Sequence, residues 1–216
     1  MIKIIENIKE LSAIENDCNR LADNLEMPLL RFEWLVNCAR TLGPGENMFV
    51  VILVEEGIVK AIAPLVLAKD NSAERLGMLG ASLHGEPCGF LYEDETYLHD
   101  LLEAIARMNK TIFFGGIREL SLEKIKIEQF SEQNKNPVMI NSKNVPYLPV
   151  HGTWESFQQK ISKSQRSSLK RLLRIAEEMG KVSIEITTPD VENVDKYLGE
   201  IFETEASSWK KEPGPR

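Results

Sequence analysis

The sequence has few cysteines and no long uninterrupted apolar run. Its three cysteines, Cys18, Cys38 and Cys88, are widely spaced and form no CxxC pair. An odd number at this spacing favours buried free thiols over a disulfide framework or a tetrahedral zinc site. The apolar stretches 48–54 and 58–68 are far shorter than the roughly 18 to 20 residues that cross a bilayer. We therefore expect neither a disulfide-rich secreted domain nor a membrane span.

The amino terminus also lacks the features of a secretory signal. Residues 1–11 include Lys3, Glu6, Lys9 and Glu10 and contain no long apolar core or small-residue cleavage site. The formal net charge is -7, which argues against a whole-surface affinity for nucleic acid or anionic membranes. We therefore expect a cytoplasmic protein with reduced thiols and no nucleic-acid partner.

What is present is an ordinary folded composition, with 43% hydrophobic and 27% charged residues over 216 residues. Apolar residues at three- and four-residue spacing predict helices, and β-branched runs between turn residues predict strands. Four helices are predicted: one that begins after Ser12, with Ser12 as its N-cap, and those over 32–39, 96–108 and 122–130. Five strands are predicted, over 48–54, 58–67, 74–79 and 111–114 and, as an edge strand, over 145–150. Alternating helices and strands indicate an α/β fold.

The pattern changes after residue 150. Residues 154–179 read as a long helix with a break near Ser162, and Gly180 is well placed at its C-terminal end. A strand over 182–187 and a helix over 191–209 follow. This change divides the chain into a first domain, 1–150, and a second segment, 151–216.

Taken together, these segments resemble the CelD/BcsL-type GNAT-fold acetyltransferases, relatives of the FemABX transferases. The resemblance rests on Phe32-Glu33-Trp34, on GIVKAIAPLVL, LGMLGASLHGEPCGFLY and VPYLPV, and on the stretch from Trp154 to Ile186. It implies a mixed sheet flanked by helices, with residues 1–150 as a first GNAT-like domain and residues 151–216 as the opening of a second. Family members continue well past this point, so the resemblance implies a chain truncated within its second unit.

The resemblance also implies an activity, the transfer of an acetyl group from acetyl-CoA to an amine or hydroxyl. The acceptor would be a small molecule or a polysaccharide-related compound. In a GNAT fold the donor lies where a strand splays from its neighbour, and a loop and helix N-terminus offer backbone N–H groups to its pyrophosphate. An inactive remnant is an alternative that truncation leaves open.

Two groups of residues are candidates for catalysis. The loop 80–89 follows the predicted strand 74–79, the third strand of the unit that contains the hairpin. In this loop His84 could shuttle a proton while Glu86 acts as a base. A polar surface loop is the alternative, and metal binding by His84 and Cys88 is not expected because two ligands do not complete a zinc site. The resemblance also implies that Glu205, Trp209 and Lys210 border the substrate, whereas a plain helix end is the alternative.

A cationic stripe stands out in this acidic chain. It contains six basic residues with no acidic residue between 161 and 176: Lys160, Lys163, Arg166, Lys170, Arg171 and Arg174. Helical spacing places most of them opposite three leucines, Leu169, Leu172 and Leu173. Such a stripe could bind a phosphate-bearing substrate, the CoA pyrophosphate, an acidic polysaccharide, a tRNA backbone or an anionic membrane surface. A solvated helix face is the alternative. The rival function is therefore a non-catalytic module that binds an anionic partner through residues 160–174.

Two familiar motifs can be set aside. Residues 40–45 spell an RxxGxG-like pyrophosphate pattern, but they follow a predicted helix and precede a predicted strand, and Pro44 removes one donor. The three histidines, His84, His99 and His151, are scattered, so no Ser/His/Asp triad can be assigned.

Overall fold

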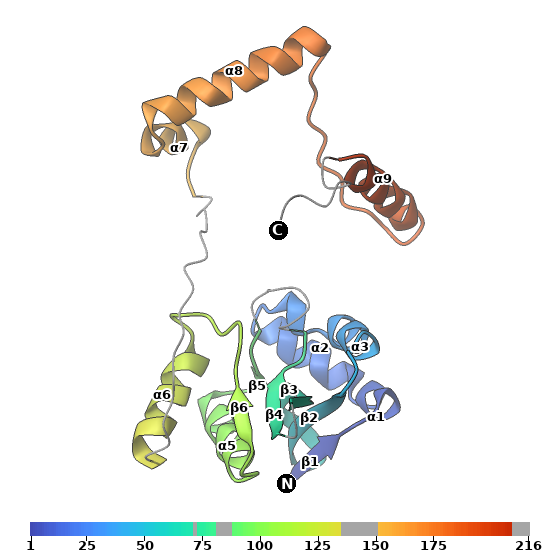
Figure 1. Cartoon of the computed structure of the whole chain (residues 1–216), viewed down its shortest axis with the longest axis vertical. Helices are drawn as coiled ribbons and strands as arrows, with labels where there is room; N and C mark the ends of the chain where they lie inside the picture. Colours follow the sequence, from blue (N-terminus) through green and yellow to red (C-terminus); the bar gives the residue numbers. More distant parts are fainter. Residues whose placement is uncertain (71–72, 81–87, 135–150, 209–216) are drawn as a thin grey trace. The chain divides into compact units, whose positions relative to one another are not determined.

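The computed structural model describes residues 1–70, 73–80, 88–134 and 151–208. The chain divides into two compact units, Met1–Asn144 and Val145–Arg216 (Figure 1). All strands of the described part lie in the first unit, and the described part of the second unit is helical with extended connections.

Unit 1 is built on a mixed six-stranded sheet. Its strands are β1 (Ile2–Ile5), β2 (Glu46–Glu55), β3 (Ile58–Asp70), β4 (Ala73–Met78), β5 (Leu91–Tyr92) and β6 (Thr111–Phe113). The order is β1-β2-β3-β4-β6, with β5 also paired to β3. All pairs are antiparallel except β4 with β6, which is parallel. The predicted α/β class with a mixed sheet is confirmed.

The β2–β3 hairpin has the turn that its sequence demands. Glu55 pairs with Ile58, so Glu56 and Gly57 form a two-residue loop. Both have positive φ values, 50° and 81°. This is the combination that a type I′ turn requires, and glycine adopts it without steric cost. The predicted hairpin is therefore confirmed.

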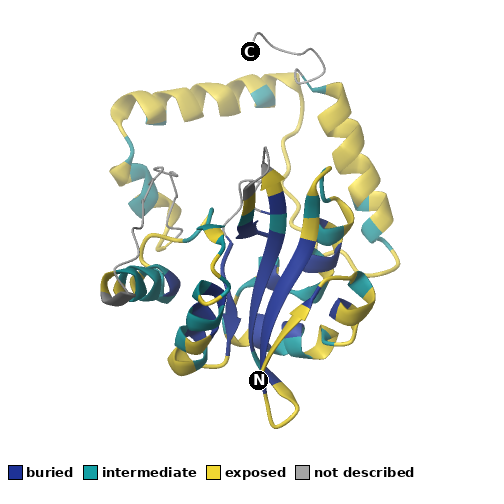
Figure 2. Cartoon of the chain, turned by 60° about the horizontal axis from the view of Figure 1, so that its bottom comes forward, coloured by how far each residue is buried: buried dark blue, intermediate teal, exposed yellow. Residues whose placement is uncertain are grey.

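Helices cover both faces of this sheet, which is the most deeply buried part of the chain (Figure 2). One core joins Val50, Ile52 and Val54 to residues of α1 (Ile8–Ser12), α2 (Glu15–Asn24), the 3-10 helix η1 (Pro28–Leu30) and α3 (Phe32–Arg40). The other joins Phe49, Val51 and Leu53 to residues of α5 (Glu95–Ala106) and α6 (Leu122–Asn134). The period-two alternation of a strand explains this division, because successive side chains of β2 point to opposite faces.

The N-terminal region differs from its prediction. Ser12 does not cap a helix: it is the last residue of α1, and its hydroxyl donates to the Ile8 carbonyl at 2.9 Å. Asn7 is the cap, accepting the Glu10 N–H at 2.9 Å, and α2 begins after Ile14 without a side-chain cap. A serine can bond back to the carbonyl four residues earlier as readily as it can cap, so the sequence alone misplaced the helix start.

Unit 2 contains α7 (Trp154–Lys160), α8 (Lys163–Met179) and α9 (Val194–Ser207). The predicted break near Ser162 is confirmed, because Ser162 and Gln165 form a reciprocal capping box at the start of α8. The predicted strand over 182–187 is wrong, since these residues form no ladder. Their apolar alternation is correct for a strand, but a strand needs a neighbour, and the described part of unit 2 offers none. The predicted edge strand over 145–150 lies outside the described residues.

Candidate functional site

The clearest irregularity of unit 1 is an interruption in the strand beside β3. On one side of β3, β4 pairs as far as Leu65 opposite Met78, and β5 resumes with Ile62 opposite Leu91. Pro64 lies between these pairs, and its carbonyl accepts the Leu79 N–H at 2.9 Å. In an antiparallel strand the N–H and C=O of one residue point to the same side, so the missing proline donor faces the interruption. We call this place the junction.

The end of β6 meets the other side of the junction. The parallel pairing of β4 with β6 ends at Gly77 and Phe113. Beyond it the Cys88 N–H donates to the Gly116 carbonyl at 3.0 Å, which ties the chain entering β5 to the chain leaving β6. The parallel pairing of β4 with β6 therefore ends here, and the next backbone contact of the chain after β6 is with the chain that enters β5.

A buried carboxylate lies against the junction. Glu123, in the first turn of α6, is only 5% exposed and is the one buried charged side chain of the described residues. A Cβ added to Gly89 would lie 3.4 Å from its Oε1 atom, so the carboxylate sits against the backbone at that point. Burial raises the pKa of Tyr92 to about 12, assisted by the charge of Glu123 and by a hydrogen bond to it. The Tyr92 hydroxyl is thus the donor and the Glu123 carboxylate the acceptor of a hydrogen bond at the junction.

Sequence reasoning missed this pair because no motif marks it. A glutamate in the first turn of a helix is usually solvated and favoured by the helix dipole. Only the tertiary packing of Gly89 and Tyr92 shows that Glu123 is enclosed.

The loop candidates, His84 and Glu86, lie outside the described residues, and so do Trp209 and Lys210 at the chain end. Glu205 lies exposed on α9. Cys18, Cys38 and Cys88 are buried and outside any disulfide, which confirms the predicted reduced state of all three cysteines. Among described residues no group of three or more His, Cys, Asp and Glu could hold a metal ion.

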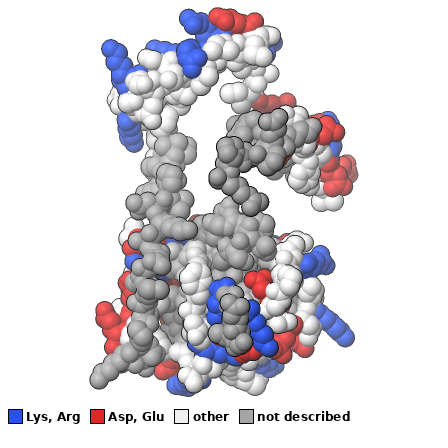
Figure 3. Space-filling model, viewed as in Figure 1, with Lys and Arg blue, Asp and Glu red and all other residues white. Residues whose placement is uncertain are grey.

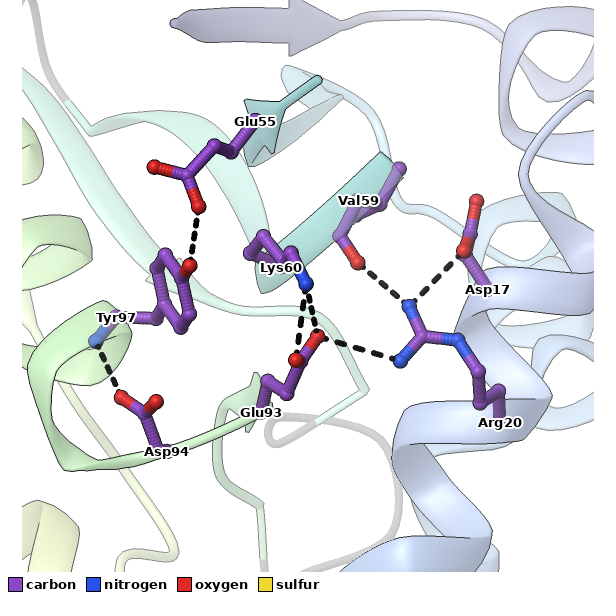
Figure 4. A network of polar contacts seen from close by, with 8 residues as sticks. All are labelled: Asp17, Arg20, Glu55, Val59, Lys60, Glu93, Asp94 and Tyr97. Carbon is purple, nitrogen blue, oxygen red and sulfur yellow. Dashed lines mark hydrogen bonds and ion pairs between the residues drawn. The ribbon is translucent and has the colours of Figure 1, made fainter. Parts of the chain in front are cut away.

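The start of α5 is acidic, and Figure 4 shows how its carboxylates are held. Asp94 is the N-cap, and its Oδ1 accepts the N–H groups of Thr96 and Tyr97 at 2.8 and 3.2 Å. Glu93, just before it, binds Lys60 Nζ through both carboxylate oxygens at 2.8 and 2.9 Å. Glu95 follows in the first turn.

This arrangement does not fit the pyrophosphate of a CoA donor. Pyrophosphate binding at a helix N-terminus needs free N–H groups and little competing negative charge. Here the Asp94 carboxylate already accepts two of these N–H groups, so they are not free to bind the anion. The first turn of α5 is therefore not a pyrophosphate site.

Unit 1 also has a surface groove, which lies away from the junction. It has a volume of about 730 Å³ and lies between the β2–β3 turn, the chain start and α5. Its lining includes Lys3, Glu55, Asp100 and Arg107, but neither Glu123 nor Tyr92.

Lys163, Lys170 and Arg174 lie on the face of α8 opposite the leucines, as the spacing predicted, whereas Lys160 belongs to α7. Lys163, Lys170 and Arg171 are exposed, and no acidic side chain of the described residues lies within ion-pair distance of them. Arg174 pairs with Glu178 at 3.6 Å. Figure 3 shows Lys and Arg side chains projecting from α8.

Arg166 has a different place from the other cations. It is half-buried, and its Nη1 atom donates to the carbonyls of Gln158 and Ile161, each at 2.8 Å. Arg166 thus fastens the end of α7 to α8.

The rejection of residues 40–45 as a pyrophosphate motif is confirmed by its context. The segment follows α3, which ends at Arg40, and precedes β2, which begins at Glu46. A phosphate loop needs the reverse order of elements.

Comparisons with known proteins return only distant similarity. No family model matches the chain, and no curated protein does. One solved structure that it resembles is a ribosomal-protein-alanine N-acetyltransferase from Brucella melitensis biovar Abortus 2308, with 7% identity and a TM-score of 0.39 over 68% of this chain and 99% of that one. A second is a possible acetyltransferase from Clostridium difficile 630, with 14% identity and a TM-score of 0.37 over 70% of this chain and 99% of that one. A third is glucosamine-6-phosphate N-acetyltransferase from Arabidopsis thaliana, with 15% identity and a TM-score of 0.30 over 70% of this chain and 99% of that one. At these identities and TM-scores the likeness carries no argument about the activity or substrate of this chain.

Proposed function

We propose that this chain is an acyltransferase-related protein, with a first GNAT-like domain over 1–150 and the opening of a second over 151–216. Its reaction is the transfer of an acetyl group from acetyl-CoA to an amine or hydroxyl of a small-molecule or polysaccharide-related acceptor. The observation that supports this proposal most is the Glu123–Tyr92 pair at the junction. Acetyl transfer to an amine or hydroxyl requires the acceptor to lose a proton, and a held carboxylate is a group that can take it.

The acidic start of α5 limits where the donor can bind. In this proposal the donor phosphates lie away from Asp94, so the role of α5 is structural. Glu123 is assigned as the proton acceptor, and Tyr92 orients its carboxylate.

The test begins with thermal unfolding of the chain with and without acetyl-CoA, with free CoA and ATP as further ligands. Ligand at about a hundred times its Kd stabilises the folded state by ~2.7 kcal/mol, which raises the midpoint by several degrees for a chain of this size. We expect a shift with the CoA compounds and an equal shift in Asp94→Asn. A cooperative unfolding transition with no shift in either protein would contradict the proposal.

The role of Glu123 is tested separately in Glu123→Gln. We expect this variant to keep the acetyl-CoA shift and to lose acetyl transfer, measured as CoA release with a panel of amines and sugars. Glu128→Gln, on a more exposed part of the same helix, is the matched control and should retain transfer. Equal transfer rates in the two variants would remove Glu123 from the reaction.

A second candidate is a non-catalytic module that binds an anionic partner through α8. The exposed cations Lys163, Lys170 and Arg171, which have no ion pair with the described residues, favour it. A convex helix face is better matched to an extended anionic surface than to a small molecule, which normally binds in a concavity. Binding to heparin that falls steeply with salt and is lost in Lys170→Glu/Arg171→Glu, without any response to acetyl-CoA, would favour this candidate over the first.

A further inference from the structure

The second face of α8 is as exposed as its cationic face. Five apolar side chains lie on it: Leu169 (41% exposed), Leu172 (55%), Leu173 (53%), Ile175 (38%) and Met179 (86%). At 100° per residue they cluster opposite Lys163, Lys170 and Arg174. α8 is therefore a helix with one cationic and one apolar side, both open to solvent.

We propose that α8 lies on the surface of an anionic lipid bilayer, an inference that rests on the second candidate function above. Lipid headgroups supply phosphates for Lys163, Lys170 and Arg171, and the acyl-chain boundary receives the leucines. A strongly amphipathic helix with low mean hydropathy and a Lys/Arg-rich polar face is the kind that lies in this interface.

A nucleic acid or another soluble polyanion matches only half of these features. It would neutralise the cations but leave the apolar face of α8 in water. Removing that face from water is favourable by the area it buries, so a partner that covers both faces fits better. A lipid surface is the partner that offers both kinds of contact to one helix.

α7 adds an aromatic group beside this helix. Trp154 is 55% exposed and stacks on Phe157, with ring centroids 5.4 Å apart and an interplanar angle of 28°. Arg166 holds α7 against the start of α8 through Gln158 and Ile161. Tryptophan favours the membrane–water interface because its ring is apolar and its N–H is polar.

The contact is peripheral and confined to this region. No helix of the described part is long and apolar enough to span a membrane. The chain carries a net charge of -7, so an anionic surface repels the protein as a whole. Glu177 and Glu178 lie at the C-terminal end of the cationic stripe. The first turns of α8 are therefore the part that an anionic surface attracts. Association should therefore weaken strongly as salt screens the cations.

The test is co-sedimentation of the full chain with vesicles of phosphatidylcholine alone and of phosphatidylcholine mixed with phosphatidylglycerol. We expect binding to the mixed vesicles only, together with a blue shift of fluorescence that is absent in Trp154→Phe. Each cation near an anionic surface contributes about fivefold in affinity, so Lys170→Gln/Arg171→Gln should weaken binding about 25-fold. Lys181→Gln/Lys196→Gln is the matched control and should bind as the wild type does.

The apolar face is tested by Leu172→Ala/Leu173→Ala, which keeps a good helix former at both positions. We expect at least about a tenfold loss of vesicle binding, whereas Ile184→Ala/Ile186→Ala, outside the helix, should bind as the wild type does. Circular dichroism confirms that the helix content is unchanged.

The outcomes separate this inference from the function on which it rests. Binding to heparin that resists Leu172→Ala/Leu173→Ala, with no binding to mixed vesicles, overturns the lipid partner and leaves an anion-binding module. Binding to neither overturns both. A change of oligomeric state in Leu172→Ala/Leu173→Ala, without vesicle binding, assigns the apolar face to a second copy of the chain instead.

Discussion

Lys60 holds both carboxylate oxygens of Glu93, at 2.8 and 2.9 Å from its Nζ atom. Arg20 of α2 approaches the same carboxylate at 3.6 Å and donates to the Val59 carbonyl at 2.7 Å. Glu93 therefore links β3, α2 and the segment that enters α5 (Figure 4). The charge of Glu93 is therefore balanced by Lys60 and Arg20, and its role at the start of α5 is structural.

Replacing Lys60 should destabilise unit 1. The Lys60 side chain is 17% exposed, whereas the Glu93 side chain is 36% exposed, so solvent screens part of the interaction. We expect Lys60→Met to lower the free energy of unfolding by about 1 kcal/mol, measured by urea denaturation. Lys69→Met, which removes a more exposed pair at 3.8 Å, is the control and should cost less than about 0.5 kcal/mol. Equal losses in the two variants would contradict a special role for Lys60.

Asp94 should stabilise α5 through its side-chain oxygen rather than through its charge alone. Asp94→Ala removes the acceptor of two N–H groups and should cost about 1 kcal/mol of unfolding free energy. Asparagine keeps an acceptor at the N-cap, so Asp94→Asn should lose only a few tenths. Denaturant unfolding of the two variants measures the difference. If both lose the same amount, the dipole interaction rather than the hydrogen bonds is what Asp94 contributes.

The sequence predicted well those elements whose cause is local. The hairpin follows from Glu56 and Gly57 in its turn, and the break before α8 follows from a serine with a glutamine three residues later. Such signals involve neighbouring residues only and need no tertiary contact.

Elements that depend on distant partners were missed or wrongly predicted. β5 consists of two residues and exists because Ala61 and Ile62 of β3 are free to pair at the junction. Residues 182–187 have the alternation of a strand but no ladder. Glu123 belongs to the same class, because its burial depends on Gly89 and Tyr92.

Gly80 should tolerate no side chain. Its φ is +85°, and an added Cβ would lie 2.8 Å from the Cys38 sulfur. We expect Gly80→Ala to cost about 2 to 4 kcal/mol of unfolding free energy, from backbone strain and the clash together. Gly57→Ala has a similar φ of +81° and open space around it, so it reports the strain alone, about 1 kcal/mol. Chemical denaturation measures both.

The clash can be separated from strain by a double-mutant cycle. Cys38→Ala removes the sulfur that the new methyl group would meet. The double variant Gly80→Ala/Cys38→Ala should therefore lose less stability than the sum of the two single variants. Additive losses would show that the Cys38 sulfur is not what limits this position.

Cys18 should make stability fall at alkaline pH. Burial, with a smaller effect of the Asp17 charge, raises the pKa of this thiol from 9.0 to about 12. In the unfolded chain the thiol ionises near 9, whereas in the folded protein it stays neutral. Its contribution is therefore fully present below about pH 9 and is lost as the pH rises toward 12. We expect the wild type to lose about 2 kcal/mol more than Cys18→Ala between about pH 8 and pH 10.5, measured by urea unfolding. Parallel pH profiles would mean that the thiol ionises alike in both states.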